Sequence, residues 1–133
     1  MKRLLSILFV LMLSFCAYSQ VYKYQSYEYS SRYLNDNGYW SEWKDWEPSD
    51  VLIVINPPKQ RVTIYSKEIQ EYDFYDVSEE KSDGQGGTES DFYGVNADGL
   101  RCQVRFRFQK NGVMQLYVFF SNFQCVYNIK SKD

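Results

Sequence analysis

The feature that most constrains the fold of this chain is a repeated change from short apolar runs to turn residues. The sequence contains 13 tyrosines and 9 phenylalanines, and these lie with valine and isoleucine in runs of strand length. Such residues suit a pleated sheet, and no stretch keeps the 3.6-residue apolar period of a helix. Turn residues interrupt the runs at 35–38, 57–58, 83–87, 98–99 and 111–112. The pattern predicts an antiparallel, all-β domain.

The runs predict a meander of eight or nine strands, at about 21–34, 39–47, 50–56, 61–67, 69–78, 88–96, 100–109, 113–120 and 123–129. A meander of this length hides its edges most economically by closing, fully or nearly, into a small up-and-down barrel. A two-sheet sandwich is the alternative. We expect residues 20–133 to form a single domain, because this length suffices for one core.

Two hairpins can be placed in register from their side chains. Pairing Asn56 with Arg61 sets Ile55 opposite Val62 and Ile53 opposite Ile64 on one buried face. In the second hairpin, a three-residue loop at 110–112 pairs Phe108 with Met114, Phe106 with Leu116 and Val104 with Val118, so that these six residues share a buried face. Gly112 then occupies the left-handed position of a bulged loop. This register turns Arg101, Arg105 and Arg107 outward, as a solvated face.

The two cysteines after residue 19 are Cys102 and Cys125. A two-residue turn at 121–122 would place Val118 opposite Cys125, so that a third strand separates the two thiols. Strands spaced about 4.8 Å apart then hold the cysteines beyond disulfide reach. We therefore expect two buried thiols, with a disulfide as the alternative.

The first nineteen residues have the form of a secretory signal peptide. Lys2 and Arg3 precede a mostly apolar run at 4–15, and Ala17 and Ser19 occupy the −3 and −1 positions of a cleavage site. We expect a mature chain that begins at Gln20 and is exported to the periplasm or beyond the cell, without spanning a membrane. Lipidation of Cys16 is the alternative.

Composition limits the chemistry of the chain. The sequence has no histidine, which excludes histidine-dependent triads and imidazole-ligated zinc. It holds 15 basic and 17 acidic residues, and loss of Lys2 and Arg3 leaves 13 against 17. This acidity argues against a nucleic-acid partner. We expect no enzymatic activity and no cofactor.

Three tryptophans, Trp40, Trp43 and Trp46, form the densest apolar feature. A regular strand would put Trp40 and Trp46 on one face and Trp43 on the other. Two of them filling the core is the favoured interpretation, and an aromatic binding platform is the alternative. In that alternative, part of the aromatic run at 72–75, including Tyr72 and Phe74, would line the site with the tryptophans.

The segment Gly38-Tyr39-Trp40 resembles the Gly-x-Trp motif of small exported lipocalin-like barrels. The resemblance implies an up-and-down barrel that holds a small apolar or aromatic ligand. A protein-interaction module, such as a periplasmic inhibitor or accessory subunit, is the alternative. The sequence leaves the ligand, the partner and the oligomeric state open.

Overall fold

The computed structural model describes residues 20–132, so the predicted signal peptide and Cys16 lie outside the described residues. The strands are β1 (Tyr22–Tyr33), β2 (Glu47–Pro48), β3 (Leu52–Asn56), β4 (Arg61–Tyr65), β5 (Ile69–Val77), β6 (Lys81–Ser82), β7 (Thr88–Asn96), β8 (Arg101–Phe108), β9 (Met114–Phe119) and β10 (Phe123–Ser131). A 3-10 turn, Pro57–Lys59, joins β3 to β4.

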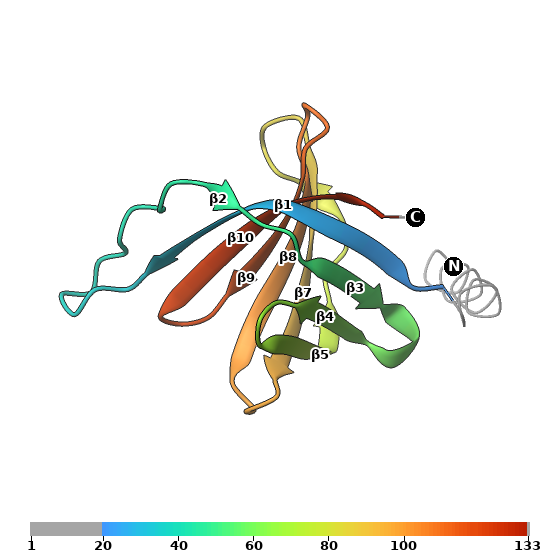
Figure 1. Cartoon of the computed structure of the whole chain (residues 1–133), viewed down its shortest axis with the longest axis horizontal. Helices are drawn as coiled ribbons and strands as arrows, with labels where there is room; N and C mark the ends of the chain where they lie inside the picture. The colour runs from blue at the N-terminus through green and yellow to red at the C-terminus, as the bar shows by residue number, and fades with distance from the viewer. Residues whose placement is uncertain (1–19, 133) are drawn as a thin grey trace.

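Eight of these strands form a closed antiparallel barrel (Figure 1). The order is β1-β3-β4-β5-β7-β8-β9-β10, and β10 pairs back with β1 from Tyr24 opposite Ser131 to Tyr33 opposite Phe123. Short β2 adds to β1, and β6 adds to β7. The expected all-β barrel is confirmed, and the sandwich alternative is not adopted.

Both predicted hairpin registers are confirmed. Ile53 lies opposite Ile64 and Ile55 opposite Val62. In the second hairpin Phe106 lies opposite Leu116, and the Gln109 N–H donates to the Val113 carbonyl at 2.9 Å. Gly112 has a φ of 89°, the left-handed conformation that this loop requires.

The interior of the barrel is filled by side chains from every long strand. Its most buried members are Ile53, Val62, Ile64, Val104, Leu116, Val118 and Ile129. The predicted buried face is wrong at one end, where Phe108 is 46 % exposed. The β8–β9 turn extends beyond the core there, and Phe108 packs its ring against that of Phe106, at 5.0 Å.

Cys102 on β8 and Cys125 on β10 are both buried free thiols, as predicted. Strand β9 lies between their strands, and Val118 lies opposite Cys125. The spacing of strands in a sheet therefore keeps the sulfurs apart.

The strand expected at 39–47 is reduced to the two residues of β2. The Ser41 N–H donates to the Tyr33 carbonyl at 2.8 Å, and the Lys44 N–H donates to the Ser31 carbonyl at 3.0 Å. The two donors lie three positions apart in the chain, whereas their acceptors lie only two positions apart. One extra residue therefore interrupts the ladder and changes which side chains share a face.

Candidate functional site

A pocket of about 340 Å³ lies at the end of the barrel where β3 turns into β4. Its apolar wall is formed by Ile55, Phe74, Val77 and Phe92, and its polar rim includes Asn56, Gln60, Arg61 and Asp76. Ile55 and Phe92 are only partly buried and pack on the core from its edge. The pocket is therefore an apolar opening where the packed interior ends.

A β-bulge in β5 gives the pocket its shape. Phe74 lies opposite Gly94 and Asp76 lies opposite Tyr93, so Tyr75 is an extra residue on β5. The bulge brings both Phe74 and Val77 to the interior side of the strand, although they lie three positions apart. A Cβ on Gly94 would collide with the Asp73 carbonyl oxygen, so the close approach of the two strands needs glycine at this position.

The turn between β3 and β4 forms the opposite wall. Gln60 ends this turn in the left-handed conformation, with a φ of 52°, and its N–H donates to the Pro57 carbonyl at 2.9 Å. The Gln60 carbonyl accepts from the Phe74 N–H at 2.8 Å. A strained turn and a bulged strand are thus tied to each other at the pocket, which is where rigid ligand sites are commonly built.

Two aromatic rings dominate the apolar wall. The rings of Phe74 and Phe92 lie 4.8 Å apart between centroids, with 32° between their planes. The two tilted rings therefore form the aromatic part of the pocket wall, against which a further aromatic group could pack.

The basic group at the rim, Arg61, is already paired with two carboxylates. The Arg61 Nε lies 2.7 Å from Asp73 Oδ1, and its Nη1 lies 3.2 Å from Glu71 Oε1. The hydrogen bond that Arg61 donates to Asp73 raises the pKa of Arg61, so the guanidinium remains charged. Asp76 accepts from the Val77 N–H at 2.9 Å. One arginine against three carboxylates leaves the rim acidic, with its guanidinium already paired.

The structure separates the five residues predicted to form one site. Phe74 lines the pocket, whereas Tyr72 is buried in the core against Phe120, with ring centroids 6.2 Å apart. The three tryptophans lie elsewhere, on the segment that returns from the end of β1. The expectation that two of them fill the core is wrong, because none belongs to the buried set.

Trp40 and Trp43 lie on the same side of the chain, around Arg32. The guanidinium carbon of Arg32 is 5.1 Å from the Trp40 ring centroid and 4.8 Å from that of Trp43. The Arg32 Nε donates to Gln124 Oε1 at 2.7 Å. Since the neighbouring Ser31 and Cys125 pair faces inward, this stack lies on the outside of the barrel.

The outer row of rings continues across the sheet from this stack. Trp43 contacts Tyr117 edge to face at 6.2 Å, and Tyr117 stacks on Phe119 at 5.4 Å. Phe119 in turn carries the Arg105 guanidinium over its ring at 5.4 Å. Alternation within β9 already places Tyr117 and Phe119 outward, but the sequence gives no sign that the tryptophan segment folds back onto them.

The expectation that Arg105 and Arg107 form a solvated face is wrong. Their side chains are only 27 % and 20 % exposed, because Arg105 pairs with Asp91 and Arg107 with Asp83. Arg101, at the start of β8, is exposed as expected. The missed signal is the β7–β8 pairing, which sets the acids of one strand beside the bases of the next.

Comparison of the chain with protein-family models, with curated proteins and with solved structures finds no match. Between residues 20 and 132, no three His, Cys, Asp or Glu side chains come together as metal ligands would. Over the same range there is no helix with the length and apolar character needed to cross a membrane. Function is therefore argued from the geometry of the pocket and of the outer surface.

Proposed function

We propose that this protein is a non-catalytic, exported β-barrel that binds a small, uncharged aromatic molecule in the pocket at the end of the barrel. The observation that carries the proposal is the apolar wall of Ile55, Phe74, Val77 and Phe92, which lies open at the edge of the packed core.

The size and lining of the pocket support a small ligand. Its volume of about 340 Å³ is at the lower end of the range for small-molecule sites, which are mostly apolar with a few polar groups. The paired rings of Phe74 and Phe92 favour a flat partner. The side-chain amides of Asn56 and Gln60 at the rim are suited to one polar substituent.

The acidic rim disfavours an anionic ligand. Arg61 is already bound to two carboxylates, and Asp76 would repel an anion. Burying an ion in the apolar wall would also cost its hydration.

The N-terminal segment supports export to the periplasm or the exterior, where such a barrel would carry or sense its ligand. The chain has no histidine, and the proposal assigns it no reaction. The Gly38-Tyr39-Trp40 segment supports a lipocalin-like protein only through its sequence, since it lies in the turn after β1, away from the pocket.

The uncharged fluorophore phenylnaphthylamine tests the proposal by its increase in emission in an apolar site. The variant Val77→Glu places a carboxylate at the mouth, and Leu100→Glu is its matched control. The two positions are 54 % and 59 % exposed, and Leu100 lies in the β7–β8 turn, outside the pocket. We expect Val77→Glu to weaken binding by about tenfold, and Leu100→Glu to leave it unchanged.

The anionic analogue anilinonaphthalene sulfonate should bind more weakly than the uncharged probe. Amide chemical shifts in the NMR spectrum should change at Ile55, Phe74, Val77 and Phe92 on addition of the uncharged probe. Equal binding by the two glutamate variants, or stronger binding of the anionic analogue, would contradict the proposal.

A further inference from the structure

The segment that returns from β1 forms an arm, residues 34–48, that projects from the barrel (Figure 1). The arm begins where β1 ends, turns at Gly38 with a φ of 86°, and comes back to the barrel through β2. It lies at the opposite end of β1 from the pocket, since Ile55 pairs with Tyr22. The ligand site and the arm are thus separate features.

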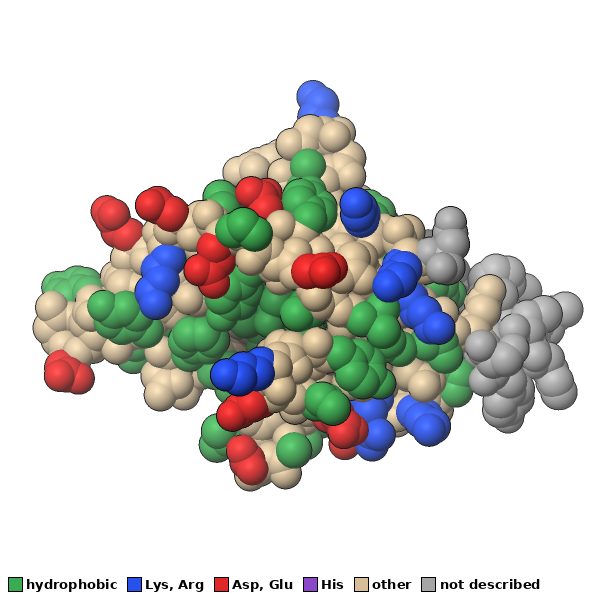
Figure 2. Space-filling view, in the orientation of Figure 1, with side chains coloured by type: hydrophobic (Ala, Val, Ile, Leu, Met, Phe, Trp, Pro, Cys, Tyr) green, Lys and Arg blue, Asp and Glu red, His purple; other side chains and the backbone are tan. Residues whose placement is uncertain are grey.

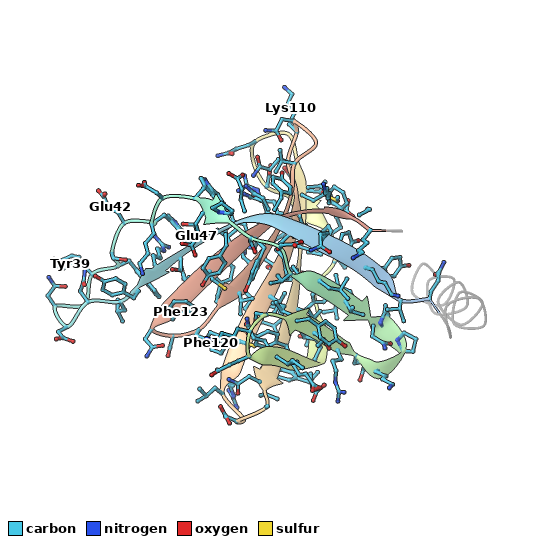
Figure 3. All side chains as sticks on the ribbon, in the orientation of Figure 1. Tyr39, Glu42, Glu47, Lys110, Phe120 and Phe123 are labelled. Carbon is cyan, nitrogen blue, oxygen red and sulfur yellow. The ribbon has the colours of Figure 1, made fainter. Side chains whose placement is uncertain are left out.

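Large aromatic side chains are exposed on the arm and on the strand leading to it. Tyr39 is 73 % exposed, Trp46 is 45 % exposed, and Tyr33 at the end of β1 is 49 % exposed. Figure 3 shows Tyr39 and Glu42 far from the barrel axis. Exposed apolar groups rimmed by polar residues mark interaction surfaces, and tyrosine and tryptophan are enriched there.

The arm is held in one conformation by contacts that leave these aromatics free. Arg32 lies between the rings of Trp40 and Trp43, and the Ser30 hydroxyl donates to the Lys44 carbonyl at 2.6 Å. Asn35 N–H donates to the Tyr39 carbonyl at 2.8 Å across the turn. An arm that is ordered before binding loses little conformational entropy when it docks.

The arm is strongly acidic. It carries four carboxylates and one basic side chain, namely Asp36, Glu42, Asp45, Glu47 and Lys44. Among the described residues, none of these carboxylates takes part in an ion pair, in contrast to Asp83 and Asp91 on the barrel. Figure 2 shows the acidic and apolar side chains interspersed over this part of the molecule.

We propose that the arm docks onto a protein whose surface presents lysine and arginine side chains around an apolar groove. Tyr39 and Trp46 would enter the groove, and the carboxylates would meet the basic rim. A second copy of this chain would bring one acidic arm against another in a two-fold contact, which charge repulsion opposes. Nucleic acid and anionic membranes would be repelled for the same reason.

A photo-crosslinking residue, p-benzoylphenylalanine, placed at Tyr39 of the full chain tests this in the organism that makes the protein. The same residue at Leu100, which is 59 % exposed, is the control. We expect a crosslink to one other protein from position 39 and none from position 100. The crosslinked peptide of the partner should lie in a basic surface.

The purified partner then allows a measurement of affinity against salt concentration. The double variant Glu42→Lys/Glu47→Lys reverses two charges on the arm, and Glu79→Lys/Glu80→Lys makes the same change at two exposed positions of the barrel. We expect the arm variant to weaken binding by about tenfold or more and the barrel variant by less than about twofold. The affinity of the native chain should fall as salt rises.

Four results would overturn the proposal: a crosslink to a second copy of the chain, no crosslink specific to position 39, a contacted surface that is acidic or neutral, or equal effects of the two double variants. None of these results bears on the pocket, which the fluorescent probe tests in the absence of any partner.

Discussion

Asp91 and Arg105 lie opposite each other on β7 and β8, on the outside of the barrel, and yet Asp91 is completely buried. Arg105 Nε approaches Asp91 Oδ1 to 2.8 Å, and Lys81 Nζ from β6 reaches Oδ2 at 3.1 Å. The Phe119 ring covers the guanidinium from β9. The outer face of the sheet therefore carries a small buried cluster, in which one carboxylate is paired with two cations.

The first prediction is that Arg105→Ala destabilises the fold far more than loss of an exposed arginine. Without Arg105, buried Asp91 loses the closer of its two cationic partners and keeps Lys81, and we expect a cost of about 2–3 kcal/mol in the free energy of unfolding. Arg101→Ala on the same strand, an exposed position, should change it by about 0.5 kcal/mol at most. Urea denaturation measures both, and equal costs would show that the ion pair contributes nothing.

The second prediction is that the folded protein loses stability at low pH. Burial opposes ionisation of Asp91, but hydrogen bonds from Arg105 and Lys81 outweigh it, so its pKa lies below the ordinary value of 3.8. The backbone N–H of Gln85, with that of Gly87 and the Arg107 side chain, lowers the pKa of Asp83. The unfolded chain therefore takes up these protons first as pH falls.

The stabilisation from both carboxyls is thus fully present above pH 3.8, the pKa in the unfolded chain. It is lost as the pH falls through the lower pKa values that the two groups have in the folded protein. Denaturant unfolding at about pH 6 and about pH 3 should show this loss. The variants Asp83→Asn and Asp91→Asn should each lose less stability between the two pH values than the native protein. An unchanged pH dependence in both variants would contradict the assignment.

The third prediction tests the core. Phe106 is 8 % exposed and Phe108 is 46 % exposed, although they lie two residues apart on β8. Phe106→Ala should cost about 3–5 kcal/mol, because it leaves a cavity in the packed interior. Phe108→Ala should cost about 1 kcal/mol, because water already reaches that ring. Thermal or urea unfolding compares the two, and a reversed order would contradict the register of β8.

The fourth prediction is that neither cysteine reacts in the folded protein. Burial raises the pKa of Cys125 to about 12 and that of Cys102 to about 11, so both remain thiols at neutral pH. Alkylation followed by mass spectrometry should be slower by about a hundredfold in native buffer than in urea. A reductant should not change the unfolding midpoint. A mass lower by two hydrogens would instead reveal a disulfide.

The fifth prediction concerns the arm. Arg32→Met keeps a long side chain but removes the charge between Trp40 and Trp43, and we expect a loss of about 1–2 kcal/mol. The tryptophan emission should shift to longer wavelength, and chymotrypsin should cut the arm faster. Arg61→Met, which breaks only exposed ion pairs, is the control and should leave both readouts unchanged.

Local pairing explains which parts of this fold the sequence predicts. The 53–64 and 104–118 registers depend on adjacent strands and on turn chemistry, and both are confirmed. Asp91 is different, because its burial depends on Lys81 from β6, which pairs with Asp91 itself, and on Phe119 from β9, which covers Arg105. No short window of sequence contains that convergence.

The candidate site, too, could be predicted from the sequence only where local alternation decides which way a side chain points. Alternation places Phe74 inward, but the bulge at Tyr75 that brings Val77 beside it leaves no mark in the pattern of apolar residues. The prediction for the tryptophans is wrong for a related reason. The extra residue between Ser41 and Lys44 changes the spacing of side chains on one face of the segment from two positions to three. Irregular backbone of this kind is set by the whole barrel.

The pairing of β1 with β10 closes the barrel, and the Lys132 N–H also donates to the Lys23 carbonyl at 2.9 Å. During synthesis on the ribosome, β1 is made about a hundred residues before the strand that covers its edge. A nascent chain therefore holds an aromatic, half-paired strand open until β10 has been made. Chaperones that shelter such edges should bind the incomplete chain, and a ribosome that stops before Phe123 releases a product that cannot close.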